Sequence, residues 1–396
     1  MQTKRHTYLP FTFRPEDLLG REPIILDLQN AFERVRHRNI LITGASGTIG
    51  GELAVQVCAC APARMILIDQ AETGLYERDY QLKQQFPATH ITCLIADITD
   101  ARRMADLFSK NKIDIIFHAA AYKHVPFMER HPYEAIKTNV FGTAILADLA
   151  ISRSVGQFVY ISTDKAIRPA GIMGATKHFG ELYLQYLSRE HPERTQFIIT
   201  RFGNVLGSNG SFLIRFAQQI REGGPVTVTH PEAERYLMTV TEACQLVLLA
   251  AAQSNGSEVL SFDMGKPVCI ANIARDMIRL AGMEPDKDIP IVFTGLRAGE
   301  KLTEELHTGE NEAIPGRLCA VPFPDRPYLC MRATLEALQK ALDSGEPQQM
   351  VSVLKMVIPE YISANSPYEA LDNARGAQSG PDRRQPTADV NWRPNQ

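Results

Sequence analysis

The chain has 396 residues, of which 44% are hydrophobic and 22% are charged, and its formal net charge at pH 7 is −3. This length predicts one large or two medium-sized domains with a sizeable core. A slightly negative charge without a long basic run argues against nucleic acid or a membrane surface as the main partner. We find neither an apolar run of about 18 residues nor the apolar centre of a signal peptide, so we expect no membrane span.

The seven cysteines are scattered, mostly within apolar segments. An odd number of such cysteines predicts reduced thiols and a cytoplasmic protein. Cys58 and Cys60 lie on a predicted helix and have no matching second pair, so we predict no metal site.

The first 37 residues (1–37) form an extension with one short helix over 27–37, in which Leu28, Phe32 and Val35 recur at helical spacing and predict the buried face. From Asn39 onward, apolar strands alternate with helices. The predicted strands are 40–43, 65–69, 91–97, 113–118, 158–162 and 196–202, and the predicted helices are 48–60, 72–86, 100–111, 132–154 and 173–190. This alternation predicts an α/β fold with a Rossmann-type doubly wound parallel sheet over 38–203.

After residue 204 the pattern loosens and predicts a smaller α/β substrate-binding domain over 204–330, interleaved with the first domain. Its predicted helices are 211–222, 240–253, 270–281 and 300–307, and its predicted strands are 226–229, 259–263 and 290–293. A C-terminal helical segment follows over 331–364, with a helical pair at 333–357. The tail 365–396 is rich in Gly, Pro, Asn, Gln and Arg, so we expect it to be disordered.

A G-x-x-G-x-x-G turn follows the first strand of the sheet and leads into a helix, with glycines at Gly44, Gly47 and Gly50. Such glycines allow a tight turn and let a pyrophosphate approach the helix N-terminus closely. Asp69 ends the next strand, where a carboxylate can accept hydrogen bonds from a ribose diol and repel a 2′-phosphate. We therefore predict NAD in preference to NADP, with a Rossmann-like domain that binds no nucleotide as the alternative. The remaining candidates for cofactor contact are Ser46, Thr48, Ile49, Asp97, Ile98, Ala119, Ala120 and Ala121.

Residues 160–177 read Y-I-S-T-D-K-A-I-R-P-A-G-I-M-G-A-T-K and resemble the catalytic segment of a short-chain dehydrogenase/reductase. In that layout a Ser or Thr follows a buried strand and a Tyr-x-x-x-Lys pair lies on the next helix. Lys177 stands at the lysine position, but Met173 stands at the tyrosine position, and a thioether cannot relay a proton. Acid–base chemistry would then fall on Thr163, Asp164 and Lys165. The alternative is an ordinary surface turn.

Longer strings carry a closer resemblance. They include H-A-A-A-Y-K-H-V-P-F-M-E (118–129), S-T-D-K-A (162–166), M-G-A-T-K (173–177), R-F-G-N-V-L-G-S (201–208) and G-L-R-A-G-E-K-L (295–302). Together they resemble the nucleotide-sugar 4,6-dehydratases of the extended short-chain dehydrogenase/reductase superfamily, in the polysaccharide-biosynthesis branch that acts on UDP-N-acetylglucosamine. Some members of that family also carry methionine at the position of Met173. Departures such as Ile214, where a proline is usual, fall in the half expected to hold the sugar.

The resemblance implies a mechanism. NAD⁺ would take a hydride from sugar C4 while Thr163 holds O4 and Lys177 binds the nicotinamide ribose. Lys165 would remove the C5 proton, Asp164 would protonate the departing C6 hydroxyl, and the hydride would return to C6. For these roles the pKa of Asp164 must be raised and that of Lys165 lowered, which requires burial to outweigh their opposite charges.

The resemblance also implies further contacts. Asn139 would be the structural asparagine that this superfamily carries near the cofactor. Arg297 and Arg235 are candidates for the diphosphate, because a guanidinium fork matches phosphate oxygens. Contacts to ribose, sugar or neighbouring side chains are expected from Lys123, Asn204 and Glu300. A homo-oligomer is expected because the helices corresponding to 132–154 and 173–190 pair in this superfamily.

Three other functions stay open at this point. A dehydratase that also inverts C5 would share every motif. A simple 4-epimerase or reductase normally needs the tyrosine that Met173 replaces. A catalytically silent nucleotide-binding protein would not need the S-T-D-K turn.

Overall fold

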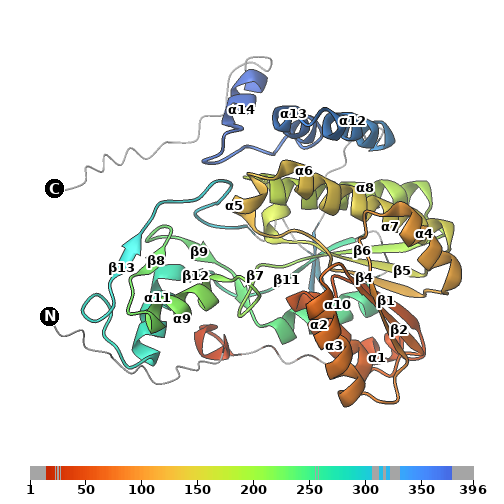
Figure 1. Cartoon of the computed structure of the whole chain (residues 1–396), viewed down its shortest axis with the longest axis horizontal. Helices are drawn as coiled ribbons and strands as arrows, with labels where there is room; N and C mark the ends of the chain where they lie inside the picture. Colours follow the sequence, from red (N-terminus) through yellow and green to blue (C-terminus); the bar gives the residue numbers. More distant parts are fainter. Residues whose placement is uncertain are drawn as a thin grey trace.

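The computed structural model describes residues 15–22, 24, 26, 28–254, 256, 258–305, 312–314, 318–321 and 331–376. Its centre is a nine-stranded sheet of order β14-β15-β11-β6-β5-β4-β1-β2-β3 (Figure 1). The strands are β1 (Asn39–Thr43), β2 (Arg64–Asp69), β3 (Ile91–Ile95), β4 (Ile115–His118), β5 (Gln157–Ile161), β6 (Gln196–Arg201), β11 (Glu258–Phe262), β14 (Glu312–Ile314) and β15 (Leu318–Val321). The seven strands from β11 to β3 are parallel, and β15 and β14 are antiparallel additions at one edge. The predicted Rossmann-type parallel sheet is therefore confirmed.

Both faces of the sheet are covered, which explains why its strands are apolar throughout. Alternate residues of one strand enter opposite cores: Leu41 belongs to one hydrophobic cluster, while Ile40 and Ile42 belong to the other. One face is covered by α4 (Ala101–Lys110), α7 (Thr143–Ser152) and α8 (Ile172–Glu190), and the other by α1 (Gln29–Val35), α2 (Thr48–Ala59), α3 (Glu72–Gln85) and α10 (Val240–Gln253) (Figure 1).

The short helix of the extension has a different buried face from the predicted one. Ala31 and Val35, one turn apart, are buried in α1, and the helix packs on α10. Phe32 is 42% exposed, so its predicted place on the buried face is wrong. The small side chain of Ala31 allows the close packing that the aromatic ring would prevent.

The predicted helix 132–154 is present but not uniform. It consists of α6 (Pro132–Ala135), the π-helical segment η2 (Ile136–Gly142) and α7. Within the described chain, Pro132–Ser152 is the one helical stretch that is long and apolar enough to cross a membrane, and 61% of its most apolar window is buried inside the fold. A π-helical turn within a longer helix often marks a functional site, and η2 contains Asn139.

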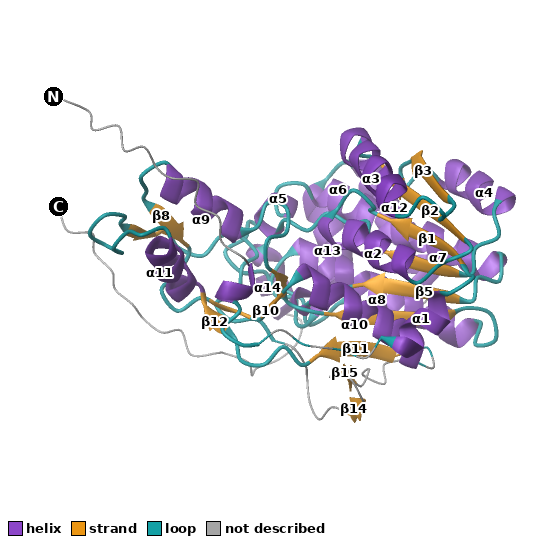
Figure 2. Ribbon diagram, turned by 90° about the horizontal axis from the view of Figure 1, so that it is seen from below, coloured by secondary structure: helices purple, strands orange, loops and turns teal. Residues whose placement is uncertain are grey.

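A second region lies beyond the end of the sheet (Figure 2). It contains β8 (Val226–Val228), β13 (Ile291–Phe293), α9 (Phe212–Arg221) and α11 (Ile270–Leu280) around its own hydrophobic core. Three two-stranded pairs occur here: β13 with β8, β7 (Asn204–Val205) with β10 (Leu237–Met238), and β9 (Glu234–Arg235) with β12 (Val268–Cys269). Because β11 and β15 return to the main sheet, the chain crosses between the two regions more than once.

The predicted helix over 300–307 is wrong for its described part. Residues 300–305 form no helix, and Thr303 makes an isolated bridge with Glu234. The backbone oxygens of Lys301 and Leu302 accept hydrogen bonds from the Arg235 side chain, so a tertiary contact replaces bonding within a helix. The rest of that range lies outside the described residues.

The C-terminal helices α12 (Met331–Ser344) and α13 (Pro347–Val357) form the predicted helical pair, and α13 packs on α6 and α8 (Figure 1). The predicted disorder of the tail is wrong as far as residue 376, because α14 (Glu369–Gly376) is helical. The Lys355 ammonium anchors this segment: it lies 2.5 Å from Asp372 Oδ1 and 4.0 Å from the centre of the Tyr361 ring. Residues 377–396 lie outside the described part.

Removing this anchor should loosen the C-terminal segment. Lys355→Met leaves Asp372 without its cation, and we expect the free energy of unfolding of residues 358–372 to fall by about 2 kcal/mol. Hydrogen exchange followed by mass spectrometry measures the effect. The neighbouring exposed Met356→Ala is the control, and equal exchange in the two variants would show that the ion pair contributes nothing.

Candidate active site

Two glycines of the turn after β1 have no room for a side chain. Gly44 has φ +70°, and a Cβ there would lie 2.7 Å from the Ala120 backbone nitrogen. At Gly50 a Cβ would lie 2.2 Å from the Gly44 carbonyl oxygen. No side chain caps α2 at Gly47, which leaves the first N–H groups of the helix open to an anion. This cradle fits the pyrophosphate of a dinucleotide.

Asp69 lies where the sequence predicts the ribose carboxylate. Its Oδ2 accepts from the Ser46 backbone nitrogen at 2.9 Å, and its Oδ1 accepts from the Ala71 nitrogen at 2.9 Å. The carboxylate thus joins the glycine turn to the loop after β2. Each oxygen has a second lone pair, so hydrogen bonds to ribose hydroxyl groups are still possible.

The other predicted cofactor residues follow neighbouring strands at the same edge of the sheet. Asp97 is half-buried and accepts from the Thr99 nitrogen at 2.8 Å, while Ile98 is buried beside Gly142. Thr48 Oγ1 accepts from the Asn209 nitrogen at 3.0 Å, which brings the second region onto the glycine turn. The structure therefore gathers these residues around one path, with Ile49 and Ala119–Ala121 half-buried along it.

A buried hydrogen-bond chain lies beneath that path and fixes the state of His118. Thr143 Oγ1 donates to the Asn139 carbonyl at 2.7 Å, so it must accept from His118 Nε2 at 2.9 Å. His118 Nδ1 then accepts from Thr43 Oγ1 at 2.7 Å, and Thr43 Oγ1 accepts from the Ala120 nitrogen at 3.2 Å. Burial, aided by the charge of Lys177, lowers the pKa of His118 well below its usual value. The ring is a neutral link between the ends of β1 and β4.

Asn139 has the structural role that the resemblance implies. Its Oδ1 accepts from the Tyr122 nitrogen at 2.9 Å, and its Nδ2 donates to the Tyr122 carbonyl and to Thr176 Oγ1, each at 3.0 Å. It therefore joins η2, the loop after β4 and α8, and its place near the cofactor stays a prediction.

The acid–base candidates meet just beyond β5, in the 3-10 turn η3 (Asp164–Ala166). Asp164 is fully buried, and its Oδ1 accepts from Thr163 Oγ1 at 2.8 Å and from Lys165 Nζ at 2.9 Å. Lys165 Nζ also donates to Asn204 Oδ1 at 2.9 Å. Asn204 comes from β7, so the second region completes the surroundings of the ammonium.

The charges around Lys165 act against the sequence expectation. Burial would lower the pKa of Lys165, but the carboxylates of Asp164 and Glu304 together outweigh burial and raise it. The condition that burial outweigh the opposite charge is therefore not met at Lys165 in the free protein. Lys165 is an ammonium. To act as a base it must first lose a proton, and one of its protons lies on the hydrogen bond to Asp164, the intended acid.

Lys177 lies one turn along α8 from Met173, and both side chains are buried. The Lys177 ammonium is 3.9 Å from the centre of the Tyr160 ring. Burial lowers its pKa to about 7, although Glu181 acts in the opposite direction. Met173 has no hydroxyl to share this environment, and its thioether packs in the core.

Glu181 is a buried residue that the sequence analysis missed. It accepts from Arg201 Nε at 2.8 Å, from Arg201 Nη2 at 2.5 Å and from Ser162 Oγ at 2.5 Å. Burial raises its pKa, but Arg201 overcomes this and the net value falls to about 2. The pair ties α8 to β6 and to the end of β5, and it holds the Lys177 helix in place. Only its spacing of one turn from Lys177 could have revealed it.

The two arginines predicted to bind a diphosphate differ in burial and in hydrogen-bond partners. Arg235 is buried and donates to the Glu234, Leu302 and Lys301 carbonyls at 2.7, 2.9 and 2.9 Å, and to Glu300 Oε1 at 3.1 Å. These contacts hold the 300–302 loop. Arg297 is largely exposed and touches Glu300 Oε2 through its Nε at 3.2 Å. The accessible guanidinium is that of Arg297, and Glu300 links the two arginines.

Lys123, the remaining substrate candidate, is exposed on the loop before α5 (Val125–Met128). Its neighbour His124 lies against Gly210 at the start of the second region. The structure therefore places Lys123 near the boundary between the two regions, without a direct contact to the Asp164–Lys165 pair.

The C-terminal segment also reaches this site, which no sequence pattern indicated. The Ala364 carbonyl accepts from the Gly299 nitrogen at 2.7 Å, and the Ala364 nitrogen donates to the Ala170 carbonyl at 3.0 Å. Ser366 Oγ donates to Glu129 Oε2 at 2.6 Å, and Glu129 Oε1 accepts from the Ile172 nitrogen at 2.6 Å. One segment thus joins the loop over 295–302 to the first turn of α8.

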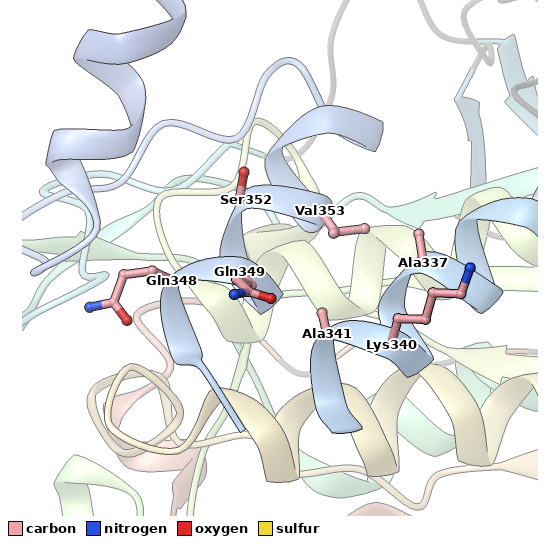
Figure 3. A pocket seen from close by; sticks show the side chains of 7 residues that line it. All are labelled: Ala337, Lys340, Ala341, Gln348, Gln349, Ser352 and Val353. Atoms are coloured by element: carbon pink, nitrogen blue, oxygen red, sulfur yellow. The ribbon is translucent and has the colours of Figure 1, made fainter. Parts of the chain in front are cut away.

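A separate hollow of about 480 Å³ opens between α12 and α13 (Figure 3). It is lined by Ala337, Lys340, Ala341, Gln348, Gln349, Ser352 and Val353. None of these residues belongs to the predicted site, and the group offers no acid–base pair. The chemistry lies instead at the strand ends.

The covering of α8 bears on assembly. It contacts α5, α6, η2, α7 and α13, and nearly all of it to Ser188 is buried within the one chain. The helix pair from which a homo-oligomer was expected is thus largely covered by the chain itself, and the oligomeric state stays a prediction.

The strand order, the glycine turn and the S-T-D-K turn beside Lys177 define an extended short-chain dehydrogenase/reductase. The family described as "Polysaccharide biosynthesis protein" matches residues 40–317, and the chain belongs to it. The family resemblance stated from the sequence is therefore confirmed.

Relatives agree with this assignment. The chain is 45% identical over 301 residues to the capsular polysaccharide biosynthesis protein CapD of Staphylococcus aureus, covering 76% of this chain and 50% of that protein. It is 30% identical over 285 residues to a UDP-glucose 4-epimerase of Rickettsia massiliae, covering 70% and 79%. Among solved structures, Pen from Bacillus thuringiensis is 31% identical with a TM-score of 0.67, covering 75% of this chain and 90% of that one. The chain spans about half the length of the first curated relatives it matches.

The contacts of Arg235 predict a measurable role before any substrate binds. Arg235→Gln should speed hydrogen exchange at residues 299–303 about tenfold or more, because it removes the donors that hold this loop. Arg297→Gln is the matched control, since its guanidinium is exposed. If Arg235 acted only as a diphosphate ligand, exchange in the free protein would not change.

The buried Lys177 predicts a dependence of stability on pH. Its pKa of about 7 lies below that of an unfolded lysine. The unfolded state therefore binds more protons between these two values, and the cost of burial grows as pH falls from about 10 to 7 and is constant below that. We expect Lys177→Met to stabilise the cofactor-free protein by on the order of 3 kcal/mol more at pH ~6 than at pH ~10. Denaturant unfolding measures this, with the exposed Lys110→Met as control; equal differences at both pH values would contradict the low pKa.

Proposed function

We propose that the protein dehydrates a nucleotide sugar with bound NAD, converting UDP-N-acetylglucosamine to the UDP-4-keto-6-deoxy sugar for surface polysaccharide or rare-sugar synthesis. The observation that carries this proposal is the hydrogen bond between Lys165 Nζ and Asp164 Oδ1 beside Thr163. An elimination needs a base and an acid together, and this pair supplies both. The family and the printed names of the relatives support the pathway and a nucleotide-sugar substrate.

The dinucleotide would lie over the glycine turn, with Asp69 at its ribose and Lys177 at the nicotinamide ribose. When bound, its nicotinamide would supply hydride chemistry, accepting from sugar C4 and returning to C6. The lone pairs of Thr163 Oγ1 would hold O4 in place. Arg297 is the diphosphate candidate with an accessible guanidinium, while Arg235 supports the loop that carries it.

The elimination balances within the Asp164–Lys165 pair. A proton first shifts from Lys165 Nζ to Asp164 along their 2.9 Å hydrogen bond, giving a neutral amine and a carboxylic acid. The amine then takes the C5 proton, which the C4 ketone has made acidic. Asp164 gives its proton to the C6 oxygen, which leaves as water. The elimination leaves the pair as it began, as ammonium and carboxylate. The proton that O4 loses when C4 is oxidised passes to solvent, and one solvent proton restores the Lys165 ammonium after it reprotonates C5.

A 4-epimerase function has relatives in its favour, including five UDP-glucose 4-epimerases of Rickettsia at 30% identity. A simple 4-epimerase normally relies on a tyrosine hydroxyl at the position of Met173, and a thioether does not replace it. Epimerisation also leaves Asp164 and Lys165 without a role. The dehydratase that inverts C5 remains the nearer alternative, since it differs only in the face from which C5 is reprotonated. A cytoplasmic location stays a prediction from the sequence.

Purified protein, NAD and UDP-N-acetylglucosamine, followed by proton NMR in heavy water, test the proposal. We expect a new C6 methyl signal with deuterium at C5 in heavy water, and the H5 coupling of product made in light water reports retention or inversion. Asp164→Asn should keep cofactor binding and lower turnover about 10²-fold or more, whereas the exposed Asp106→Asn should leave turnover unchanged. Appearance of the C4 epimer without a methyl signal would select the epimerase, and unchanged turnover in Asp164→Asn would refute the assigned acid.

A further inference from the structure

A third carboxylate, Glu304, faces the Asp164–Lys165 pair. Its side chain is 3% exposed, and its Oε1 lies 3.6 Å from Lys165 Nζ. Among the described residues its Oε2 has no hydrogen-bond partner, and neither does Asp164 Oδ2. Both carboxylates are buried, so each holds an oxygen that is neither solvated nor bonded. A buried, incompletely bonded carboxylate is costly unless its charge is used.

The groups around Lys165 explain what a second negative charge does there. Asp164 and Glu304 are its two carboxylates, Asn204 is a neutral acceptor, and Arg235 adds a positive charge. Lys301, whose ammonium donates to the Ile167 carbonyl at 2.8 Å, adds another close to the same carboxylates. With Asp164 alone, positive charge would predominate and the pair would lose its proton readily.

We propose that Glu304 is a positioning residue that keeps one shared proton on the Asp164–Lys165 pair. The inference rests on the proposed function, in which that pair must hold a single proton to act as base and acid in turn. With two protons the pair has no base, and with none it has no acid. The negative charge of Glu304 beside Lys165 favours the protonated pair and stabilises the ammonium formed when C5 is deprotonated.

Glu304 lies on the same loop as Arg297, the candidate for the diphosphate. It lies four residues after Glu300, in the loop that Arg235 holds through the Lys301 and Leu302 carbonyls. A loop displaced from the site would remove Glu304 from Lys165, so the charge of the acid–base pair depends on the loop that receives the substrate.

The pH dependence of kcat/KM tests the inference. The pair titrates as a unit, so the profile of kcat/KM against pH has an acid limb and a basic limb, one for each proton. Glu304→Gln removes a negative charge and should move both limbs to lower pH by about one unit or more, while Glu304→Asp should keep the limbs near their original positions. Glu305→Gln is the matched control, because Glu305 pairs with Arg168 and Lys301 instead. Thermal unfolding and NAD retention confirm that each variant is folded.

A purely structural role gives a different pattern. If Glu304→Gln lowers kcat/KM by one factor at every pH, with unmoved limbs, the inference is overturned. If Glu304→Asp shifts the limbs as far as Glu304→Gln does, charge is not the cause and the inference also fails.

A readout that needs no turnover separates this inference from the proposed function. Trace labelling of Lys165 by acetic anhydride, followed by peptide mass spectrometry across pH, reports the free amine directly. We expect half-maximal labelling at a lower pH in Glu304→Gln than in the unaltered protein. That shift without dehydration of any nucleotide sugar would support the charge coupling and reject the function, whereas identical labelling curves would reject the coupling even in an active enzyme.

Discussion

One half-buried ammonium, that of Lys165, organises the candidate site. Its hydrogen-bond and ionic partners come from three parts of the chain: Asp164 from the turn after β5, Asn204 from β7, and Glu304 from the loop after β13. An ammonium with little access to water requires such partners, because an unpaired buried charge costs several kcal/mol. The end of β5, β7 in the second region and the loop after β13 must therefore all be in place before the Lys165 ammonium has its partners. Forming the candidate site and forming the fold thus depend on each other.

The same requirement explains why the two lysines of the candidate site differ in pKa. Lys165 lies between carboxylates and keeps its proton, whereas Lys177 faces the ring of Tyr160 and has a pKa of about 7. Glu181 could have paired with Lys177, but two hydrogen bonds from Arg201 hold it instead. Lys165 and Lys177 are close in sequence but differ in pKa because, among the described residues, only Lys165 has carboxylates as direct partners.

Local pattern accounts for what the sequence could predict. The parallel sheet, the glycine turn at Gly44–Gly50 and the S-T-D-K turn each depend on residues that are close together in the chain. Contacts between distant segments were not predictable: Arg235 holds a loop more than sixty residues away, and Glu304 faces Lys165 across about twice that gap. Arg235 was expected to bind phosphate because a guanidinium suits either role, and only its four hydrogen bonds to Glu234 and to residues 300–302 distinguish them. The helix expected at 300–307 failed for the same reason, since those backbone oxygens accept from Arg235.

The C-terminal segment extends this dependence. Through Ala364 and Ser366 it contacts the substrate loop at Gly299, the turn before α8 at Ala170, and Glu129. Glu129 in turn accepts from the first backbone nitrogen of the helix that carries Met173 and Lys177. The segment is itself anchored by the buried Lys355–Asp372 pair. The last described part of the chain therefore sets the distance between the loop expected to receive the diphosphate and the helix expected to receive the nicotinamide ribose. A change in the Lys355–Asp372 pair would therefore alter the position of both the loop and the helix without contacting either.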